Sequence, residues 1–447
     1  MKSKQLRRIV GLLLAVTVMT GLVMGCSQKE SKSTQDSTPK KEQSMQAQTS
    51  GNEQKEFTIF ARTGPDSSTW LREVAKGFTN ETGIKVNFIE QGQSGYFTNL
   101  TNQLVGGTDS FELGVTNSTY IGPWAYAGYI DPLDDYIAKF PSDYDMKDLA
   151  FSYKINEKTY AIPYSISAHF LYYRSDLIQT PPQTWDEYIE LSKKFTKTIN
   201  PSSPTKYGTA WTAKSGPEQP KTFYNFLWSL GGDIVVDGKA AVASKAALKA
   251  GEYWDTFRKE KIIPPDMANY SYPEVLDALK TGTIAMAAPY WSAGFSDLLS
   301  SDSPYKKNIK VALLPGVKQP DGTIKRVSFN HSYTLVMNKK GKNKEAAMKY
   351  YAYLANKKNQ LAYAKIAGFP ARYSALKDSS PEMKDFFDVA LKSLEITRYE
   401  PLVSYYLEQH DIMNNALSGI MTGTVPYEDA LKKAQDELQK LIDSNKK

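Results

Sequence analysis

Short apolar runs alternate with amphipathic segments over residues 57–115, and this alternation restricts the fold more than any other feature of the sequence. The runs FTIFA, IKVNFI and FELGV have the length and composition of buried strands, and the two segments between them carry apolar residues at helical spacing. In the first of these segments Leu71, Val74 and Phe78 fall on one helical face, and Gly83 follows as a stop signal. This order predicts βαβ units and an α/β fold with mainly parallel sheets.

Residues that directly follow the predicted strands are candidates for a binding site, because such sheets bind ligands beyond the carboxyl ends of their strands. The candidates are Arg62, Thr63 and Asp66; Gln91, Gln93 and Ser94; and Thr116, Asn117, Ser118 and Tyr120. Further along, KINEKTYAIPY predicts a hairpin, and TWDEYIELSKKF predicts a helix with Thr184 as N-cap and Glu187 three residues later. The stretch from Pro201 to Gly238 is rich in Pro, Gly and Trp and suggests a second lobe with its own aromatic lining, and HSYTLVMN (331–338) predicts a strand followed by helices.

The length of 447 residues is enough for two domains, since single cores stop growing at about 250 to 300 residues. Four basic residues precede an apolar run within residues 1–25, a pattern typical of a secretory signal rather than a membrane span. Without these four charges the formal net charge falls from +7 to +3, as 7 − 4 = 3, which argues against nucleic-acid binding.

Cys26 is the only cysteine, and it directly follows the signal segment in LVMGC. This resembles the lipobox of bacterial lipoproteins, in which the cysteine becomes a lipid-carrying N-terminus. The alternative is an ordinary signal peptide with an incidental cysteine. Residues 27–54 contain no aromatic or β-branched aliphatic side chain, so we expect a disordered tether over 26–55.

The sequence carries no enzyme signature, because H-E-x-x-H, G-x-S-x-G and G-x-G-x-x-G are all absent. His169, His331 and His410 are too far apart in the sequence for metal-ligand spacing, although folding could bring His169 and His331 together. We therefore expect no catalytic residue, no metal and no other cofactor. Each histidine is interpreted as a structural group or as a polar contact for a ligand.

Aromatic side chains are frequent, with 29 Tyr, 18 Phe and 7 Trp, and this favours ligands with flat apolar faces such as sugar rings. Most of these residues are better interpreted as core packing. Trp124 in YIGPWAYAGYI and Trp291 in IAMAAPYWSAG are exceptions, since each follows a proline-marked turn. In the second segment we expect the strand to end at Ala288, Pro289 to turn the chain, Tyr290 to pack inward and Trp291 to face the ligand.

Four segments together resemble the extracellular solute-binding proteins of ABC importers, the family that includes maltodextrin- and oligosaccharide-binding proteins. They are TYAIPYSISAHFLYYRSDL, LKTGTIAMAAPYWSAG, VALLPG with SFNHSYTLVMN, and NKEAAMKYYAYLANKKNQLAYAKIAGFPARYSAL. They occur in the family's order, and the resemblance that they carry runs from about Phe57 to the C-terminal helices. Arg174 departs from the family pattern, in which Asn or Asp is usual after the Tyr.

The resemblance implies a periplasmic-binding-protein-like fold, in which two α/β lobes joined by crossover strands enclose the ligand between them. It places lobe 1 at 56–166 plus 331–372 and lobe 2 at 167–330 plus 373–447. The ligand-binding residues that it implies are Arg62, Gln93, Asn117, Trp124, Tyr164, His169, Trp291, Asn330, His331 and Arg372.

The implied function is capture of a carbohydrate, expected to be an oligosaccharide, by lobe closure, and its delivery to the transmembrane subunits of an ABC permease. The protein is expected to be a monomer, held by its lipid on the outer face of the membrane of a Gram-positive cell. Two alternatives stay open. A lipid-anchored glycoside hydrolase needs two carboxylates facing each other in the cleft, and a ligand-sensing binding protein would act on a membrane receptor.

Overall fold

The computed structural model describes residues 55–142, 144–366, 368–378 and 383–446. The predicted signal segment 1–25, Cys26 and all but the last residue of the tether 26–55 lie outside these ranges. All the elements below belong to one unit, Glu53–Lys447. Among the described residues, none of the helices has both the length and the apolar character that a membrane span requires.

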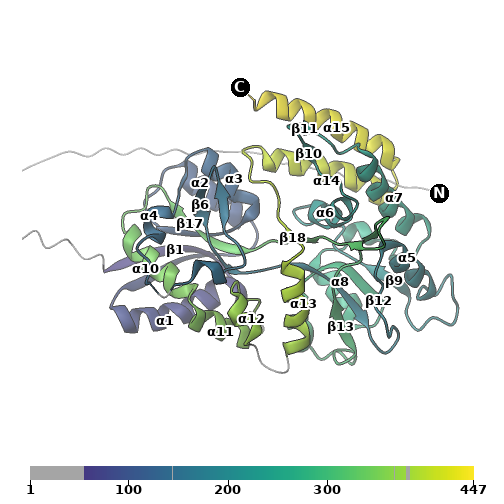
Figure 1. The fold of residues 1–447 in the computed structure, drawn as a ribbon, viewed down its shortest axis with the longest axis horizontal. Helices are drawn as coiled ribbons and strands as arrows, with labels where there is room; N and C mark the ends of the chain where they lie inside the picture. Colours follow the sequence, from purple (N-terminus) through teal and green to yellow (C-terminus); the bar gives the residue numbers. More distant parts are fainter. Residues whose placement is uncertain (1–54, 143, 367, 379–382, 447) are drawn as a thin grey trace, which may run out of the picture. The chain divides into compact units, whose positions relative to one another are not determined.

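The first sheet has the strand order β2-β1-β3-β17-β4, and β7 also pairs with β17. Figure 1 labels β1 and β17 of this sheet. Its strands are β1 (Glu56–Arg62), β2 (Lys85–Gln91), β3 (Leu113–Asn117), β4 (Ile130–Asp131), β7 (Pro163–Ser165) and β17 (Tyr333–Asn338). β1 runs parallel to β2 and β3, as the βαβ pattern predicts. β17 runs antiparallel to β3, β4 and β7. The carboxyl ends of β1, β2 and β3 therefore share one edge of the sheet.

Helices and one hairpin complete this part of the chain. The elements are η1 (Pro65–Thr69), α1 (Trp70–Thr82), α2 (Tyr96–Val105), α3 (Ser118–Tyr126), α4 (Asp134–Ile137), η2 (Met146–Asp148), β5 (Tyr153–Ile155), β6 (Lys158–Ala161), α10 (Lys344–Leu354), α11 (Lys357–Lys365) and α12 (Tyr373–Lys377). The predicted stop of α1 is confirmed, because Gly83 adopts a left-handed conformation (φ 73°) and donates its N–H to the carbonyl of Thr79. The predicted hairpin is β5–β6, with Asn156 and Glu157 at positive φ in its turn.

The second sheet has the strand order β13-β8-β12-β9. Its strands are β8 (His169–Arg174), β9 (Tyr207–Ala210), β12 (Ile284–Trp291) and β13 (Ile309–Ala312). β8 is antiparallel to β12 and β13, and only β9 runs parallel to β12. The α/β class is confirmed, but the expectation of mainly parallel sheets is wrong. Both sheets are mixed, because strands from distant parts of the chain enter them in the opposite direction.

Strand β12 also runs three residues further than the sequence suggests. It continues through Pro289 to Trp291, and its register on β8 shifts by one residue between Ala287 and Tyr290. This β-bulge leaves Ala288 and Pro289 outside the ladder. The proline lacks an N–H, but at this position it removes no hydrogen bond between the two strands. The proline therefore does not end the strand.

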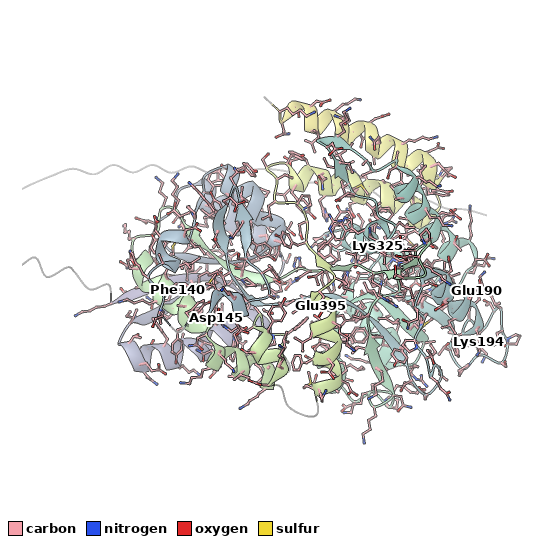
Figure 2. All side chains as sticks on the ribbon, in the orientation of Figure 1. Phe140, Asp145, Glu190, Lys194, Lys325 and Glu395 are labelled. Atoms are coloured by element: carbon pink, nitrogen blue, oxygen red, sulfur yellow. The ribbon has the colours of Figure 1, made fainter. Side chains whose placement is uncertain are left out.

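Helices and short ribbons surround the second sheet. They are α5 (Trp185–Lys194), α6 (Gln219–Ser229), β10 (Val235–Val236), β11 (Lys239–Ala240), α7 (Lys245–Lys259), η3 (Met267–Asn269), α8 (Tyr272–Lys280), α9 (Ala293–Leu299), β14 (Val317–Lys318), β15 (Ile324–Lys325), β16 (Ser328–Phe329), α13 (Lys384–Leu394), β18 (Thr397–Arg398), α14 (Tyr406–Thr422) and α15 (Tyr427–Ser444). The predicted cap of α5 is confirmed, since Thr184 accepts the backbone N–H of Glu187 at 3.2 Å. Glu190 and Lys194, labelled in Figure 2, lie one turn apart on the exposed face of this helix.

The buried apolar side chains of the described residues form two clusters. The first core draws on residues 57–164, 335–354 and 363, and the second on 166–329 and 364–442. Tyr399 and Leu402 pack against the first core, although the chain on both sides of them belongs to the second. Ala364, Phe369 and Ala371 belong to the second core, although the prediction places them in lobe 1. The lobe boundaries stay a proposal.

Backbone hydrogen bonds join the segments that cross between the cores. Ala168 and Asn330 form an antiparallel bridge, and His331 donates its N–H to the carbonyl of Ser167 at 2.6 Å. Asn330 donates to the carbonyl of Arg398 at 2.7 Å, so a third crossing segment is tied to the other two. The connection between the cores is thus a small hydrogen-bonded layer rather than isolated loops.

The third crossing segment packs tightly on α3 at Gly122. A Cβ on this glycine would lie 2.7 Å from the backbone carbon of Leu402 and from the carbonyl oxygen of Val403. We therefore expect Gly122→Ala to lower the free energy of unfolding by about 1–3 kcal/mol, because backbone must move to make room. Urea denaturation measures this change. Gly92→Ala is the control, since a Cβ there meets no atom within 4 Å, and equal stability of both variants would contradict the packing described.

Candidate functional site

A cavity of about 630 Å³ lies between elements of the two cores. The residues that line it from elements around the first core are Arg62, Gln93, Ser165, Tyr333 and Tyr363. Those that line it from elements around the second core include Glu218, Tyr272, Trp291, Asp297 and Phe386. Small-molecule sites in proteins measure roughly 300–1,000 Å³, so the volume suits a ligand of a few rings or fewer.

Trp291 forms the aromatic part of the wall. It is the last residue of β12, its side chain is 6% exposed, and its ring lies 3.9 Å from that of His169, centroid to centroid. The hydroxyl of Tyr172 donates to the backbone carbonyl of Trp291 at 2.9 Å. Tyr290 points to the other face of the strand, where it is fully buried and stacks on Tyr272 at 5.2 Å. The two neighbouring aromatics are placed as predicted, with only the tryptophan in the cavity wall.

Arg62 and Gln93 come from the carboxyl ends of β1 and β2, where the βαβ pattern predicted candidates. Arg62 is the last residue of β1 and donates from one guanidinium nitrogen to Oε1 of Gln93 at 2.5 Å. The guanidinium carbon also lies 5.0 Å from the ring centroid of Tyr333. This side of the cavity therefore presents nitrogen donors on an ordered scaffold.

His331 lines the cavity and contacts a buried lysine behind it. Nζ of Lys221, on α6, lies 3.0 Å from Nδ1 of His331 and 3.3 Å from a carboxylate oxygen of Glu218. Burial lowers the pKa of His331 well below its usual value, and the charges of Lys221 and Arg62 act in the same direction. The imidazole is therefore neutral at physiological pH.

His169 supports Trp291 from behind and is not part of the cavity wall. Its Nδ1 lies 2.8 Å from the amide nitrogen of Asn225, and burial lowers its pKa to about 3. The fold does bring His169 and His331 to the same tryptophan, since the ring of His331 lies 5.4 Å from that of Trp291. Within the described ranges, however, no group of three His, Cys, Asp or Glu residues is arranged to hold a metal ion.

Two carboxylates in the wall, Glu218 and Asp297, are not among the residues predicted from the sequence. Asp297 accepts the hydroxyl of Tyr272 at 2.6 Å. Glu218 lies between Trp211 and Trp228 in the Pro-, Gly- and Trp-rich stretch 201–238, which was the one signal in the sequence that pointed to it. The two tryptophans themselves are buried in the second core and do not line the cavity.

Asn117 and Trp124 lie outside the wall of this cavity. The side chain of Asn117 caps α3 by accepting the N–H of Thr119 at 3.1 Å. Trp124 is 2% exposed and donates its indole N–H to the hydroxyl of Thr101 at 3.2 Å. Both side chains have a structural task that the sequence pattern did not reveal, and their contact with a ligand stays a prediction.

Tyr164 and Asn330 are also outside the wall and fully buried. Tyr164 belongs to the first core, and its carbonyl accepts from Gln360 at 3.0 Å. Asn330 lies in the crossing layer, where its Oδ1 accepts the hydroxyl of Ser332 at 2.9 Å. For these two residues as well, contact with a ligand stays a prediction.

The residues after β3 face a buried carboxylate and a smaller cavity. Ser118 and Thr119 donate their hydroxyls to Glu400 at 2.7 and 2.8 Å, and burial raises the pKa of this carboxyl. Tyr120 lines a second cavity of about 380 Å³ together with His410. Position after a strand made these residues candidates for a binding site, but it did not predict which of the cavities each residue reaches.

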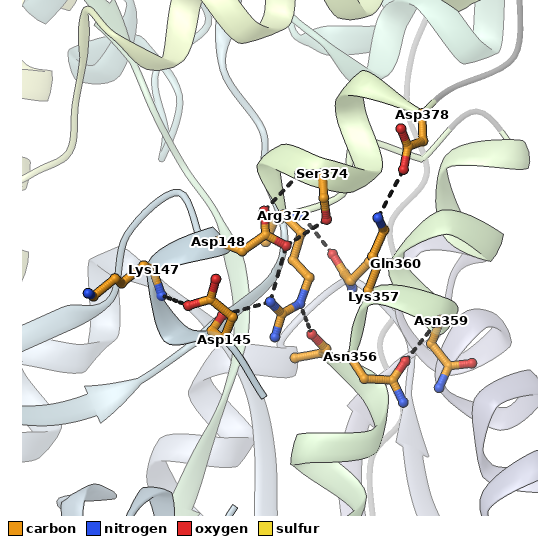
Figure 3. Close-up of polar contacts among 12 residues, drawn as sticks. Asp145, Lys147, Asp148, Asn356, Lys357, Asn359, Gln360, Arg372, Ser374 and Asp378 are labelled. Carbon is orange, nitrogen blue, oxygen red and sulfur yellow. Dashed lines mark hydrogen bonds and ion pairs between the residues drawn. The ribbon is translucent and has the colours of Figure 1, made fainter. Parts of the chain in front are cut away.

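Hydrogen bonds to three protein groups hold the guanidinium of Arg372 in place (Figure 3). Its Nε donates to the carbonyl of Ala355 at 2.5 Å, and one terminal nitrogen donates to the carbonyl of Asp145 at 2.8 Å and to the carboxylate of Asp148 at 3.3 Å. The guanidinium also lies over the ring of Tyr144 at 4.5 Å. These contacts tie the turn before α12 to the loop around η2, outside the cavity wall, and binding of a ligand by Arg372 stays a prediction.

The chain is similar in sequence to known bacterial binding proteins. The sequence pattern of bacterial extracellular solute-binding proteins matches residues 62–361. A periplasmic-binding protein of Sinorhizobium fredii, whose name assigns it to an amino-acid ABC transporter, is 25% identical over 70% of this chain and 71% of its own length. The maltooligosaccharide ABC transporter solute-binding lipoprotein of Streptococcus pneumoniae R6 is 22% identical over 94% of each chain.

A solved structure has the same fold. Maltose-bound MalE3 of T. maritima superposes with a TM-score of 0.72 and 24% sequence identity, over 86% of this chain and 99% of its own. The predicted periplasmic-binding-protein-like architecture is thereby confirmed.

We expect Arg372→Lys to lower the free energy of unfolding by about 1–3 kcal/mol, because a single ammonium group cannot reach all the acceptors of the planar guanidinium. Denaturant unfolding measures the difference. Arg398→Lys is the matched control, since its ion pair with Asp233 is 45% and 34% exposed and contributes little. A destabilisation no larger than that of the control would contradict the structural role of Arg372.

Proposed function

The chain belongs to the family of bacterial extracellular solute-binding proteins, and we propose that its cavity binds a carbohydrate for delivery to an ABC permease. Because the family consists of binding proteins, the expectation that the chain is not an enzyme is confirmed, and the glycoside-hydrolase alternative is wrong.

The wall of the 630 Å³ cavity is the observation that carries the carbohydrate assignment. Trp291 offers an apolar ring for the C–H face of a sugar, and Arg62, Glu218, Asp297 and His331 offer polar groups for its hydroxyls. A carbohydrate needs both kinds of surface in one enclosed site. The names of the pneumococcal relative and of the maltose-bound structure support the same class of ligand.

Binding is proposed to proceed by closure of two lobes around the sugar, with the closed form recognised by the permease. The cavity receives side chains from elements around both cores, so a ligand that contacts both favours the closed arrangement through its higher affinity for that state. Recognition by a membrane receptor instead of a permease stays the alternative partner.

The protein is proposed to be a monomer anchored outside a Gram-positive cell by a lipid on Cys26. The lipobox resemblance and the lipoprotein name of the pneumococcal relative support this proposal. The family description supports the extracellular location itself.

An amino acid is the second candidate ligand. The relative named for an amino-acid transporter favours it, and so does the presence of both Arg62 and two carboxylates in the wall, since an α-amino acid carries one charge of each sign. A thermal-shift panel of mono- and oligosaccharides and of amino acids distinguishes the two classes, because a ligand raises the melting temperature according to RT ln(1 + [L]/Kd).

We expect Trp291→Ala to weaken the best sugar ligand of that panel about tenfold or more, which corresponds to about 1.4 kcal/mol of lost stacking. Isothermal titration calorimetry measures the affinity. Trp211→Phe is the control, since Trp211 is buried in the second core and does not line the cavity, so its substitution should change the affinity little. Undiminished affinity in Trp291→Ala, or a panel in which only amino acids bind, would overturn the carbohydrate assignment.

A further inference from the structure

Each of the two histidines beside Trp291 has its Nδ1 bound by a side-chain nitrogen. Lys221 Nζ lies 3.0 Å from Nδ1 of His331, and Asn225 Nδ2 lies 2.8 Å from Nδ1 of His169. Lys221 and Asn225 are one turn apart on α6, and both are buried. One helix therefore sets the hydrogen bonding of both imidazole rings.

The chemistry of lysine decides which nitrogen of His331 carries the proton. An ammonium group has three N–H donors and no lone pair, so Nδ1 of His331 must accept. A neutral imidazole that accepts at Nδ1 is protonated at Nε2. Because Lys221 is buried behind the ring and does not line the cavity, the polar atom that His331 can offer to a ligand is Nε2–H.

The orientation of Asn225 is fixed in the same manner. Its Oδ1 accepts the backbone N–H of Phe329 at 2.7 Å, and its Nδ2 donates to the carbonyl of Lys221 at 2.9 Å. The amide nitrogen is therefore the atom that faces His169, which must also accept at Nδ1. His169 thus has the same tautomer, and its ring is held against Trp291.

The charges around His331 favour the neutral ring. Lys221 from α6 and Arg62 from β1 are cationic, His169 from β8 faces it as a neutral ring, and Glu218 is paired with Lys221 at 3.3 Å. Burial and these cations lower the pKa of His331. Its donor character is therefore constant across physiological pH.

We propose that Lys221 is a positioning residue that holds His331 as a neutral Nε2–H donor, so that Arg62 and His331 together recognise an oxygen acceptor of the ligand. This inference rests on the proposed function and refines it. The acceptor is a hydroxyl or ring oxygen of a sugar. Elsewhere in the cavity, Glu218 and Asp297 accept hydrogen bonds from sugar hydroxyls. An ammonium group placed against Arg62 and His331 would meet only donors and is rejected.

Long-range ¹H–¹⁵N spectra of protein labelled at histidine test the tautomer directly in the ligand-free state. We expect His331 to give the pattern of a ring protonated at Nε2, unchanged between about pH 6 and 8. A ring protonated at Nδ1, or one that titrates within this range, would overturn the inference. This result does not depend on any ligand, so failure of the sugar panel counts against the proposed function alone.

Substitution of Lys221 tests the positioning role. In Lys221→Met we expect mixed tautomers of His331, a titration of the ring moved toward its ordinary range, and about five- to tenfold weaker sugar binding that varies with pH. Lys221→Arg should restore the Nε2–H tautomer, since a guanidinium also only donates. Lys344→Met is the matched control, because Lys344 pairs with Asp131 at 2.6 Å outside the cavity. An unchanged His331 spectrum in folded Lys221→Met would contradict the proposal.

Discussion

Hydrogen bonds among the crossing segments are the interaction on which the site depends. The bridge between Ala168 and Asn330 and the bond from His331 to Ser167 hold two segments of the cavity wall in fixed positions. Along each of the two bonded segments, the residues before and after the bonds belong to different cores. A binding site assembled in this manner needs no long loop, because the wall is made by the chain where it passes from one core to the other.

The local elements of the fold were predictable because they depend on local rules. Gly83 ends α1 and Thr184 caps α5, since a left-handed glycine and a threonine N-cap act within a few residues. The direction of β17 and β8 was not predictable, because it depends on which distant strand pairs with which. The parallel pattern around β1 was correct, and its extension to whole sheets was wrong.

The site was predictable to a similar extent. Arg62 and Gln93 were predicted from the position of parallel strand ends, and both line the cavity. Trp291 lines it as well, but as the last residue of β12 and not after a turn at Pro289. Three other predicted residues make structural contacts, since Asn117 caps a helix, Trp124 packs in a core and Arg372 joins two loops. Their contact with a ligand stays a prediction. The positions of three further side chains depend on how α6 and α9 pack, and no local sequence pattern encodes this packing. These are Glu218, Asp297 and Lys221.

The bulge in β12 restricts which sequence changes this segment can accept during evolution. Alternation along a strand sends neighbouring side chains to opposite faces, so the single extra residue between Ala287 and Tyr290 decides which of the two aromatics reaches the cavity. Removing one residue there would exchange their positions, placing the larger indole in the core and the phenol in the wall. The number of residues in this stretch is therefore under tighter constraint than their identity, and insertions or deletions should be rarer here than substitutions.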